Sequence, residues 1–274
     1  MGGSQMRYAG RIRLVVVDLA GTICDGPQDL RHLYPNDDLK GVKSPVISFE
    51  RVLAKRSIRV DWATLRKPMG VFKKEHLRKL LLDETVAAQF RQAYRRDWNH
   101  NDLEEMFAEF RPIAVEVATS KELVRPIDRA KEAVDYLREA GILIGCDTGY
   151  PVEAANAVYK SLAEDYQIVF DVTADSEGVP GRPTPFLVFD CMAKAEVYPP
   201  AAVVKADDVA AGIWEGNNAG AWTVGIYATG NDDYARLAAA KPDFLIPSIR
   251  YLPDIVFGQI EPRLRRGELP GQAV

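Results

Sequence analysis

The feature that most constrains this chain is a short apolar run that ends in an acid, Leu14-Val-Val-Val-Asp18. Three consecutive β-branched residues predict a strand buried on both faces, and Gly21 just beyond it allows a sharp turn. Asp18 is therefore predicted to lie at the carboxyl end of a strand. Ligands bind at that edge of open α/β sheets, so we interpret Asp18 as a chemical group, although an acid there can also cap a loop.

Composition limits the partners of the chain. With 274 residues, of which 47% are hydrophobic, the chain can bury a full core in one large domain or two unequal ones. A charged fraction of 27% and a net charge of -4 predict no strongly basic face. We therefore expect no nucleic-acid partner and no attachment to an anionic membrane.

The cysteines and the apolar runs bear on the compartment. Cys24, Cys146 and Cys191 are far apart and form no CxxC pair, which is typical of reduced thiols. The first ten residues lack the apolar segment of an export signal, and no run of about 18 apolar residues occurs. We expect a cytoplasmic protein.

A helical insert is predicted directly after the first strand. From residue 45 to residue 122 apolar residues recur at spacings of three and four, as in Val46, Phe49 and Val52, with almost no strand signal. Residues 26–43 are rich in turn formers and charges, which predicts an exposed loop. We therefore expect an α-helical cap domain over residues 28–125.

Strands and helices alternate in the remaining chain. The predicted strands are 142–146, 168–172, 201–205, 222–227 and 243–246. The predicted helices are 127–140, 152–162, 186–195, 211–219, 232–240 and 251–260. Such alternation is typical of a parallel sheet with helices on both faces. The expected fold class is α/β, with a Rossmann-like core of residues 8–27 and 126–262 and a frayed tail of residues 263–274.

Polar groups lie at the ends of three of the later predicted elements. Thr148 and Gly149 come after a strand, where hydroxyl and N–H donors can hold phosphate oxygens. Arg182 opens a helix, and its planar guanidinium matches a phosphoryl group. Asp208 ends another strand and could join Asp18 in an oxygen-rich site for Mg²⁺. Each motif alone is more often a turn or a solvated strand end, but four at strand ends favour one common site.

Taken in chain order, Asp18, Thr148, Arg182 and Asp208 resemble the four motifs of the haloacid dehalogenase (HAD) superfamily. Its members mostly transfer phosphoryl groups through an aspartyl-phosphate, and the resemblance implies a Rossmann-like core with a cap. Phosphatases of that superfamily usually carry a second Asp two residues after the nucleophile, to protonate the leaving alkoxide. This chain has Ala20 there. Its leaving group needs no such acid, the proton comes from elsewhere, or the enzyme is degenerate.

One leaving group that needs no such acid is a carbanion delocalised as an enamine. If an aldehyde two bonds from phosphorus condenses with a lysine, the iminium accepts electrons and the carbon-phosphorus bond can break. The stretch from Arg66 to Arg78 in the insert offers lysines for this chemistry. An ordinary lysine is almost wholly protonated at pH 7, so burial or a nearby cation must lower its pKa.

The resemblance becomes specific over most of residues 12–227. The segments Asp-x-Ala-Gly-Thr, Arg-Lys-Pro-Met-Gly-x-x-Lys-x-x-His, Thr-Gly-Tyr, Gly-Arg-Pro-x-Pro and Val-Lys-x-Asp-Asp resemble the phosphonatase family, which cleaves phosphonoacetaldehyde to acetaldehyde and phosphate. The resemblance implies that Asp18 is the nucleophile and that Lys73 forms a Schiff base. It implies a Mg²⁺ site of Asp18, the Ala20 carbonyl and Asp208. It also implies a substrate-binding set of Ala20, Met69, His76, Thr148, Gly149, Tyr150 and Arg182.

Three departures from the family leave the substrate open. The loop of residues 26–43 is longer than expected, Gly212 stands where some members have a second acid, and Asp147 replaces a more familiar hydroxyl residue. One alternative is a hydrolase of another small phosphate or phosphonate, in which Lys73 binds an anion. Another is a catalytically silent ligand-binding homologue.

The resemblance also suggests a homodimer through the cap. Aromatic residues of the insert that could serve it are Trp62, Phe72, Phe90 and Tyr94. Their helical spacing is equally well explained by the core of the insert itself.

Overall fold

The computed structural model describes residue 8 and residues 10–271 of the chain. Its centre is a six-stranded sheet in the order β3-β2-β1-β4-β5-β6, with every pairing parallel. The strands are β1 (Leu14–Asp18), β2 (Leu143–Asp147), β3 (Val172–Thr173), β4 (Val203–Asp207), β5 (Trp222–Ile226) and β6 (Phe244–Ile246). The alternation of apolar runs and helical patterns in the sequence therefore produced a parallel sheet, as predicted.

The strand order places β1 at a topological switch point. Its two neighbours, β2 and β4, are reached by connections that leave in opposite directions, which opens a crevice beyond the carboxyl end of β1. Asp18 and Asp147 are register partners at that end of β1 and β2. Paired residues of parallel strands project to the same face of a sheet, so the two acids are brought together by backbone pairing.

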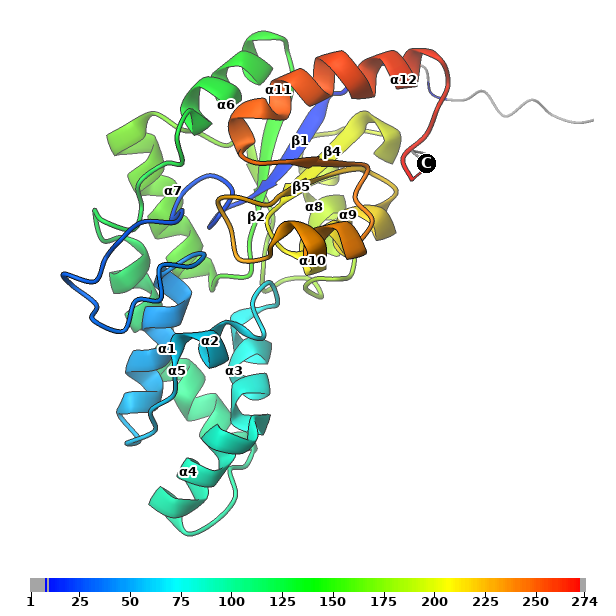
Figure 1. Cartoon of the computed structure of the whole chain (residues 1–274). Helices are drawn as coiled ribbons and strands as arrows, with labels where there is room; N and C mark the ends of the chain where they lie inside the picture. The colour runs from blue at the N-terminus through cyan, green and yellow to red at the C-terminus, as the bar shows by residue number, and fades with distance from the viewer. Residues whose placement is uncertain (1–7, 9, 272–274) are drawn as a thin grey trace, which may run out of the picture.

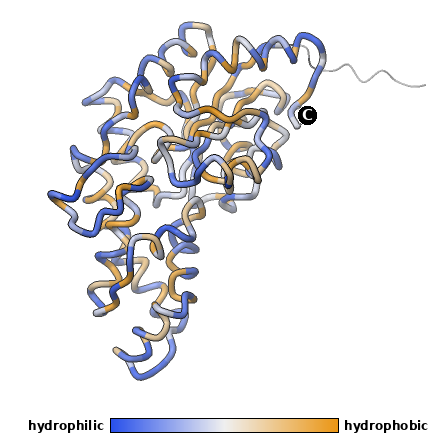
Figure 2. The backbone as a smooth tube through the Cα atoms, viewed as in Figure 1, coloured by the Kyte–Doolittle hydropathy of each residue, from blue (hydrophilic) through white to orange (hydrophobic). Residues whose placement is uncertain are grey.

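Helices cover both faces of the sheet (Figure 1). Val15 and Val17 belong to an apolar cluster shared with α6 (Ala130–Glu139), α7 (Val152–Tyr166), α11 (Leu252–Ile255) and α12 (Glu261–Arg265). Leu14 and Val16 pack with α8 (Phe186–Lys194) and α9 (Ala210–Ala219). Figure 2 shows hydrophobic stretches gathered in the strands between these layers. The two-residue period of β1 thus divides its side chains between two cores.

Five helices form the insert between β1 and α6 (Figure 1). They are α1 (Ser44–Ala54), α2 (Trp62–Arg66), α3 (Lys73–Leu82), α4 (Glu84–Tyr94) and α5 (His100–Ala118). Phe49 of α1 stacks on Phe110 of α5 with ring centroids 4.6 Å apart. Trp62 and Phe90 are buried in this core, whereas Tyr94 is exposed. The apolar core of the insert is continuous with that of the sheet face carrying Val15 and Val17.

The prediction of a strand over residues 168–172 was wrong except at its last residue. The strand in this region, β3, is only Val172–Thr173. Before it, the side chain of Asp171 accepts the backbone N–H of Ile144 at 2.8 Å. A side chain therefore occupies the place of a strand carbonyl beside β2, and regular pairing starts later than predicted.

The chain after β6 is more ordered than predicted. A π-helical turn, Val256–Ile260, joins α11 to α12, so the helix continues past Ile260 to Arg265. Leu264 is fully buried, and Glu261 accepts the backbone N–H of Ile12 at 3.3 Å. Apolar burial within the expected tail explains this order. Residues 272–274 of that tail lie outside the described residues.

The remaining short elements are η1 (Pro200–Ala202), α10 (Tyr234–Ala239) and η2 (Ile249–Tyr251).

The loop of residues 26–43 was predicted to be exposed, but only half of its residues are, and it is anchored by buried groups. Leu30 is buried, and Lys43 Nζ lies 2.5 Å from the buried carboxylate of Asp37. The loop is therefore attached to the molecule by an internal ion pair, which its composition did not reveal.

Within the described residues, no helix has both the length and the apolar character needed to cross a membrane.

Candidate active site

The crevice beyond β1 is a small cavity lined from both halves of the molecule. The sheet side contributes Asp18, Ala20, Thr148, Gly149, Tyr150, Arg182 and Asp208, and the insert contributes Met69, Gly70 and Lys73. The cavity volume is about 20 Å³. That volume holds about one water molecule. Every residue of the predicted site except His76 therefore lines one small cavity.

Asp18 is buried at the end of β1, where one oxygen accepts a hydrogen bond from Arg182 at 2.8 Å. Burial raises the pKa of Asp18 to about 6, against the opposing charge of Arg182. A carboxyl group with that pKa is mostly ionised at pH 7. Asp18 is thus available as a nucleophile at neutral pH.

Arg182 is held by carboxylates from several elements. Besides Asp18, its guanidinium contacts Asp147 at the end of β2 and Asp207 of β4, the latter at 3.3 Å. Its Nε donates to Glu215 of α9 at 3.1 Å. These partners fix the plane of the guanidinium, so that one of its nitrogens faces Asp18 without rearrangement.

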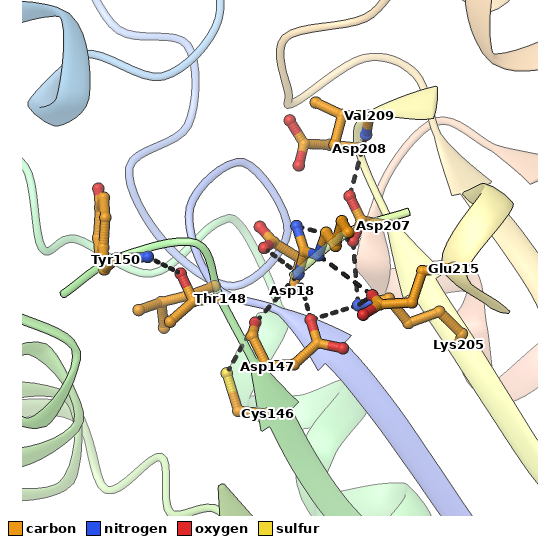
Figure 3. Close-up of polar contacts among 12 residues, drawn as sticks. Asp18, Cys146, Asp147, Thr148, Tyr150, Lys205, Asp207, Asp208, Val209 and Glu215 are labelled. Carbon is orange, nitrogen blue, oxygen red and sulfur yellow. Dashed lines mark hydrogen bonds and ion pairs between the residues drawn. The ribbon is translucent and has the colours of Figure 1, made fainter. Parts of the chain in front are cut away.

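Lys205 completes this buried ion cluster. Lys205 and Asp207 lie two residues apart on β4, so they share a face of the sheet. Lys205 Nζ contacts Asp147, lies 3.0 Å from Asp207, and lies 3.4 Å from Glu215. Figure 3 shows these side chains gathered around Asp18, with Asp208 apart from them. The surrounding carboxylates, Asp147 foremost, raise the pKa of Lys205 in spite of its burial.

Gly212 leaves the space that Asp207 occupies. A Cβ atom at Gly212 would lie 1.9 Å from an oxygen of Asp207, and the other oxygen of Asp207 accepts the N–H of Val209 at 3.0 Å. Some family members have a second acid at the position of Gly212. In this protein Asp207, from β4, places a carboxylate in that space. The sequence showed the missing acid at Gly212 but not that Asp207 would lie against it.

Two groups of acids could hold a metal ion. Oxygens of Asp18, Asp147 and Asp207 lie within 4.8 Å of one another. Arg182 and Lys205 already neutralise these acids, so a divalent cation among them would meet two positive charges.

Asp18 and Asp208 fit a cation better. Both line the cavity together with Ala20. Burial, followed by the charge of Asp18, raises the pKa of Asp208 well above its usual value. Asp208 forms no ion pair with any described residue, so its charge beside Asp18 is the kind that a hard divalent cation stabilises. Asp208 is oriented by Asn231, whose backbone and side-chain nitrogens donate to it at 2.8 and 3.0 Å.

Lys73 is buried at the first position of α3. Its Nζ lies 3.9 Å from the sulfur of Met69 and 5.2 Å from the ring centre of Tyr150, and it forms no ion pair with a described residue. Burial lowers the pKa of Lys73 to about 8, and the positive end of the helix also disfavours the ammonium form. At pH 7 roughly one molecule in ten then carries the free amine.

His76 lies behind Lys73 and outside the cavity lining. Its ring packs on Phe49 with centroids 4.1 Å apart, and its Nε2 bonds to the carbonyl of Leu65 at 2.8 Å. Burial, followed by the charge of Lys73, lowers the pKa of His76 well below its usual value. His76 is thus a neutral packing partner of the lysine helix in this arrangement.

The strand end after β2 carries Thr148 and Tyr150. Thr148 Oγ1 accepts the backbone N–H of Tyr150 at 3.3 Å, as Figure 3 shows. The Tyr150 hydroxyl contacts the hydroxyl of Ser44, which donates to Asp25 at 2.6 Å. Sequence reasoning missed Ser44 and Asp25. Their only signals were a second acid soon after β1 and a hydroxyl residue before Pro45 at a helix start.

Close backbone contacts join the insert to the sheet side. The N–H of Lys73 donates to the carbonyl of Gly149 at 3.2 Å. Gly70 has a positive φ of 95°, and a Cβ there would lie 2.7 Å from Val209. Only a glycine combines this conformation with such an approach. These contacts hold the insert close to the sheet side and leave only the small cavity between them.

A family model described as haloacid dehalogenase-like hydrolase matches residues 12–220. The phosphonoacetaldehyde hydrolase of Vibrio cholerae serotype O1 is 31% identical over 94% of this chain and 98% of that protein. The phosphonoacetaldehyde hydrolase of Bacillus cereus is 34% identical over 79% of this chain and 76% of that protein. These similarities confirm the family resemblance found in the sequence.

Solved structures show the same architecture. A phosphonoacetaldehyde hydrolase-like protein from Oleispira antarctica superimposes with a TM-score of 0.87 at 27% identity, over 98% of this chain and all of the other. A β-phosphoglucomutase from Clostridium difficile gives a TM-score of 0.66 at 18% identity, covering 92% and 98% of the two chains. The second likeness concerns the fold alone. The predicted α/β class with its helical insert is confirmed.

Proposed function

The chain belongs to the haloacid dehalogenase-like hydrolases, and we propose that it cleaves the carbon-phosphorus bond of phosphonoacetaldehyde to acetaldehyde and phosphate. The observation that carries this proposal is the position of Lys73. A buried lysine whose pKa falls to about 8 lines the same cavity as the buried carboxylate of Asp18. The proposal is further supported by the named relatives at 31% and 34% identity.

In the proposed reaction, Lys73 condenses with the aldehyde and forms an iminium ion. Asp18 then attacks phosphorus, and the bonding electrons of the carbon-phosphorus bond pass into the iminium to give an enamine. The carbon leaves without an acid at position 20, which accounts for Ala20. Protonation of the enamine and hydrolysis of the resulting iminium release acetaldehyde. Water hydrolyses the aspartyl-phosphate to phosphate.

Charge on the phosphoryl oxygens is offset by groups around Asp18. Arg182 is held in place by its carboxylate partners and faces the nucleophile, while Thr148 and Gly149 supply donors from the next strand end. We propose that Asp18, the Ala20 carbonyl and Asp208 hold Mg²⁺. When bound, that ion supplies charge neutralisation for the phosphoryl group.

The helical insert is proposed to act as a cap of residues 28–125 that opens and closes over the strand ends. A cavity of about 20 Å³ cannot admit phosphonoacetaldehyde, whereas the amine of Lys73 must reach the bound aldehyde. Opening admits the substrate, and closure brings the amine to it and excludes water. The proposed roles of Met69 and Tyr150 are to enclose the imine, and His76 supports the Lys73 helix from behind.

The test is a coupled assay of acetaldehyde and phosphate release from phosphonoacetaldehyde, with borohydride added in parallel to trap an imine. Wild type should release both products in equal amounts and become covalently labelled at Lys73. Lys73→Arg keeps the charge but forms no imine, so it should lose labelling and at least about 1,000-fold in turnover.

Lys74→Arg is the matched control. Lys74 is the next residue along, and its ammonium lies 2.6 Å from Glu104 on the surface of the insert. This variant should keep wild-type turnover and labelling. Phosphate release without labelling, or equal turnover in Lys73→Arg, would reject the imine and favour a hydrolase of another small phosphorylated substrate.

A further inference from the structure

Three buried polar side chains form a hydrogen-bonded series that ends at the active-site cavity. Tyr150 lines the cavity, and its hydroxyl contacts the hydroxyl of Ser44 at the start of α1. The Ser44 hydroxyl donates at 2.6 Å to Asp25, which follows the turn after β1. Asp25, Ser44 and Tyr150 are each at most 4% exposed. A continuous hydrogen-bonded path therefore links the cavity to an internal carboxyl group.

Part of this path has a structural purpose. Asp25 accepts the backbone N–H of Lys43 at 3.0 Å and that of Ser44 at 2.9 Å. These N–H groups lie at the start of α1, where they have no partner within the helix and the N-cap side chain provides none, so Asp25 caps the helix. Capping requires only the carboxylate of Asp25. It does not require the Ser44 hydroxyl or its contact with Tyr150, so these two groups need another explanation.

The proposed reaction has a need that these groups can meet. Condensation of an amine with an aldehyde consumes one proton, and Ala20 offers none on the sheet side. Lys73 Nζ lies over the Tyr150 ring, 5.2 Å from its centre, and both residues line the cavity, so Tyr150 is part of the wall around the reacting aldehyde. Burial raises the pKa of Tyr150 well above its usual value and that of Asp25 to about 6. Tyr150 therefore keeps its proton, and Asp25 can exchange one near neutral pH.

We propose that Asp25 and Ser44 form a proton relay that supplies the aldehyde oxygen through Tyr150 while Lys73 forms its imine. The proposal rests on the proposed function and adds residues to it. When Asp25 is protonated, its hydroxyl donates to Ser44 instead of accepting from it, and the Ser44 hydroxyl turns to donate to Tyr150. Asp25 then passes a proton to Ser44, Ser44 passes its own to Tyr150, and Tyr150 passes its own to the aldehyde oxygen.

The relay step balances. The Lys73 nitrogen forms a bond to the aldehyde carbon, and the carbon-oxygen double bond breaks. Water departs with the aldehyde oxygen, one proton from the relay and one from the amine. The iminium keeps the positive charge, and Asp25 becomes a carboxylate. Hydrolysis of the product iminium takes up water and returns the proton to Asp25, so the relay is restored at each turnover.

The experiment compares Ser44→Ala with Ser44→Thr in the full chain. Ser44→Ala removes the hydroxyl but keeps both backbone N–H bonds to Asp25, so the cap of α1 remains. Ser44→Thr restores a hydroxyl. The readouts are the single-turnover rate of borohydride-trapped imine with phosphonoacetaldehyde in H₂O and D₂O, and the melting temperature.

We expect imine formation to be about 100-fold slower in Ser44→Ala, the usual scale for loss of positioned proton transfer. Ser44→Thr should recover most of this rate, and both variants should melt close to wild type. Wild type should be slower in D₂O, and Ser44→Ala should lose that dependence. A Ser44→Ala rate equal to wild type overturns the relay alone. Failure of wild type to trap any imine overturns the proposed function and the relay with it.

Discussion

Lys73 and Lys205 are both buried lysines, yet their surroundings give them opposite properties. Lys205 lies among three carboxylates, two at strand ends and one on α9, which raise its pKa. Lys73 lies at the positive end of a helix in the insert, beside a thioether and an aromatic ring, and its pKa falls to about 8. Depth of burial is the same in both regions, so the number of paired carboxylates decides whether a buried lysine is a fixed cation or a reactive amine.

The comparison also separates two tasks. The strand ends hold their charges in fixed positions around Asp18, because each cation there has several carboxylate partners. In the insert, Lys73 has no carboxylate ion-pair partner among the described residues, and its helix contacts the sheet side through a few close backbone approaches. Charges held in fixed positions suit phosphoryl transfer, and an amine with a lowered pKa suits imine formation.

The largest expected effect on stability comes from removing the fixed cation. Lys205→Met keeps the length of the side chain but leaves Asp147, Asp207 and Glu215 short of one buried partner. Breaking a buried ion cluster in this way costs about 3–5 kcal/mol. Urea unfolding should show that loss. Lys194→Met, which removes a half-exposed ion pair with Asp190, should cost less than about 1 kcal/mol. Equal losses in the two variants would contradict the distinction drawn between fixed and free lysines.

The sequence predicted the strand ends better than the contacts between them. Asp18, Thr148 and Asp208 each follow an apolar run, so the parallel sheet brought them to one edge as expected. The ion cluster was not predicted, because Arg182 and Glu215 meet only after two helices pack on the sheet. Local pattern locates residues along an element, whereas such pairings depend on the packing between elements.

In the insert the sequence predicted the helices but not which of their buried side chains would face the cavity. The spacing of apolar residues gave the helical block, yet Lys73 and His76 share one turn of α3 and point into different surroundings. The link from Asp25 to Ser44 spans the long loop of residues 26–43, and no periodicity relates residues across a loop. Strand β3 shows the same limit, because the Asp171 side chain replaced a backbone partner.

A second prediction uses pH to expose the free amine. The pKa of Lys73 is about 8 in the folded protein and about 10.4 when unfolded, so the unfolded state binds more protons between these values. The cost of burying the ammonium is therefore fully present below pH 8 and disappears as the pH rises to about 10.4. It amounts to about 3 kcal/mol. Lys73→Met removes that cost, so it should be more stable than wild type at pH 7.

The measurement is the difference in unfolding free energy between wild type and Lys73→Met at pH 7 and near pH 10. Other titrating groups are common to both proteins and cancel in this difference. The advantage of Lys73→Met should shrink by most of its value over that range. A difference that is constant with pH would show that Lys73 keeps an ordinary pKa, and the contrast with Lys205 would fail.

The smallest expected effect comes from Gly212, which leaves room for the Asp207 carboxylate beside Lys205. A methyl group at Gly212 would lie 1.9 Å from Asp207, so Gly212→Ala should displace that acid and cost about 1–3 kcal/mol. In the Asp207→Gly background the clash is absent, and alanine is the better helix former. Gly212→Ala should then stabilise by up to about 1 kcal/mol. This reversal of sign in a double-mutant cycle, measured by urea unfolding, would place Asp207 in the space above Gly212. Additive effects would mean that the acid lies elsewhere and that Lys205 has fewer carboxylate partners than its contacts indicate.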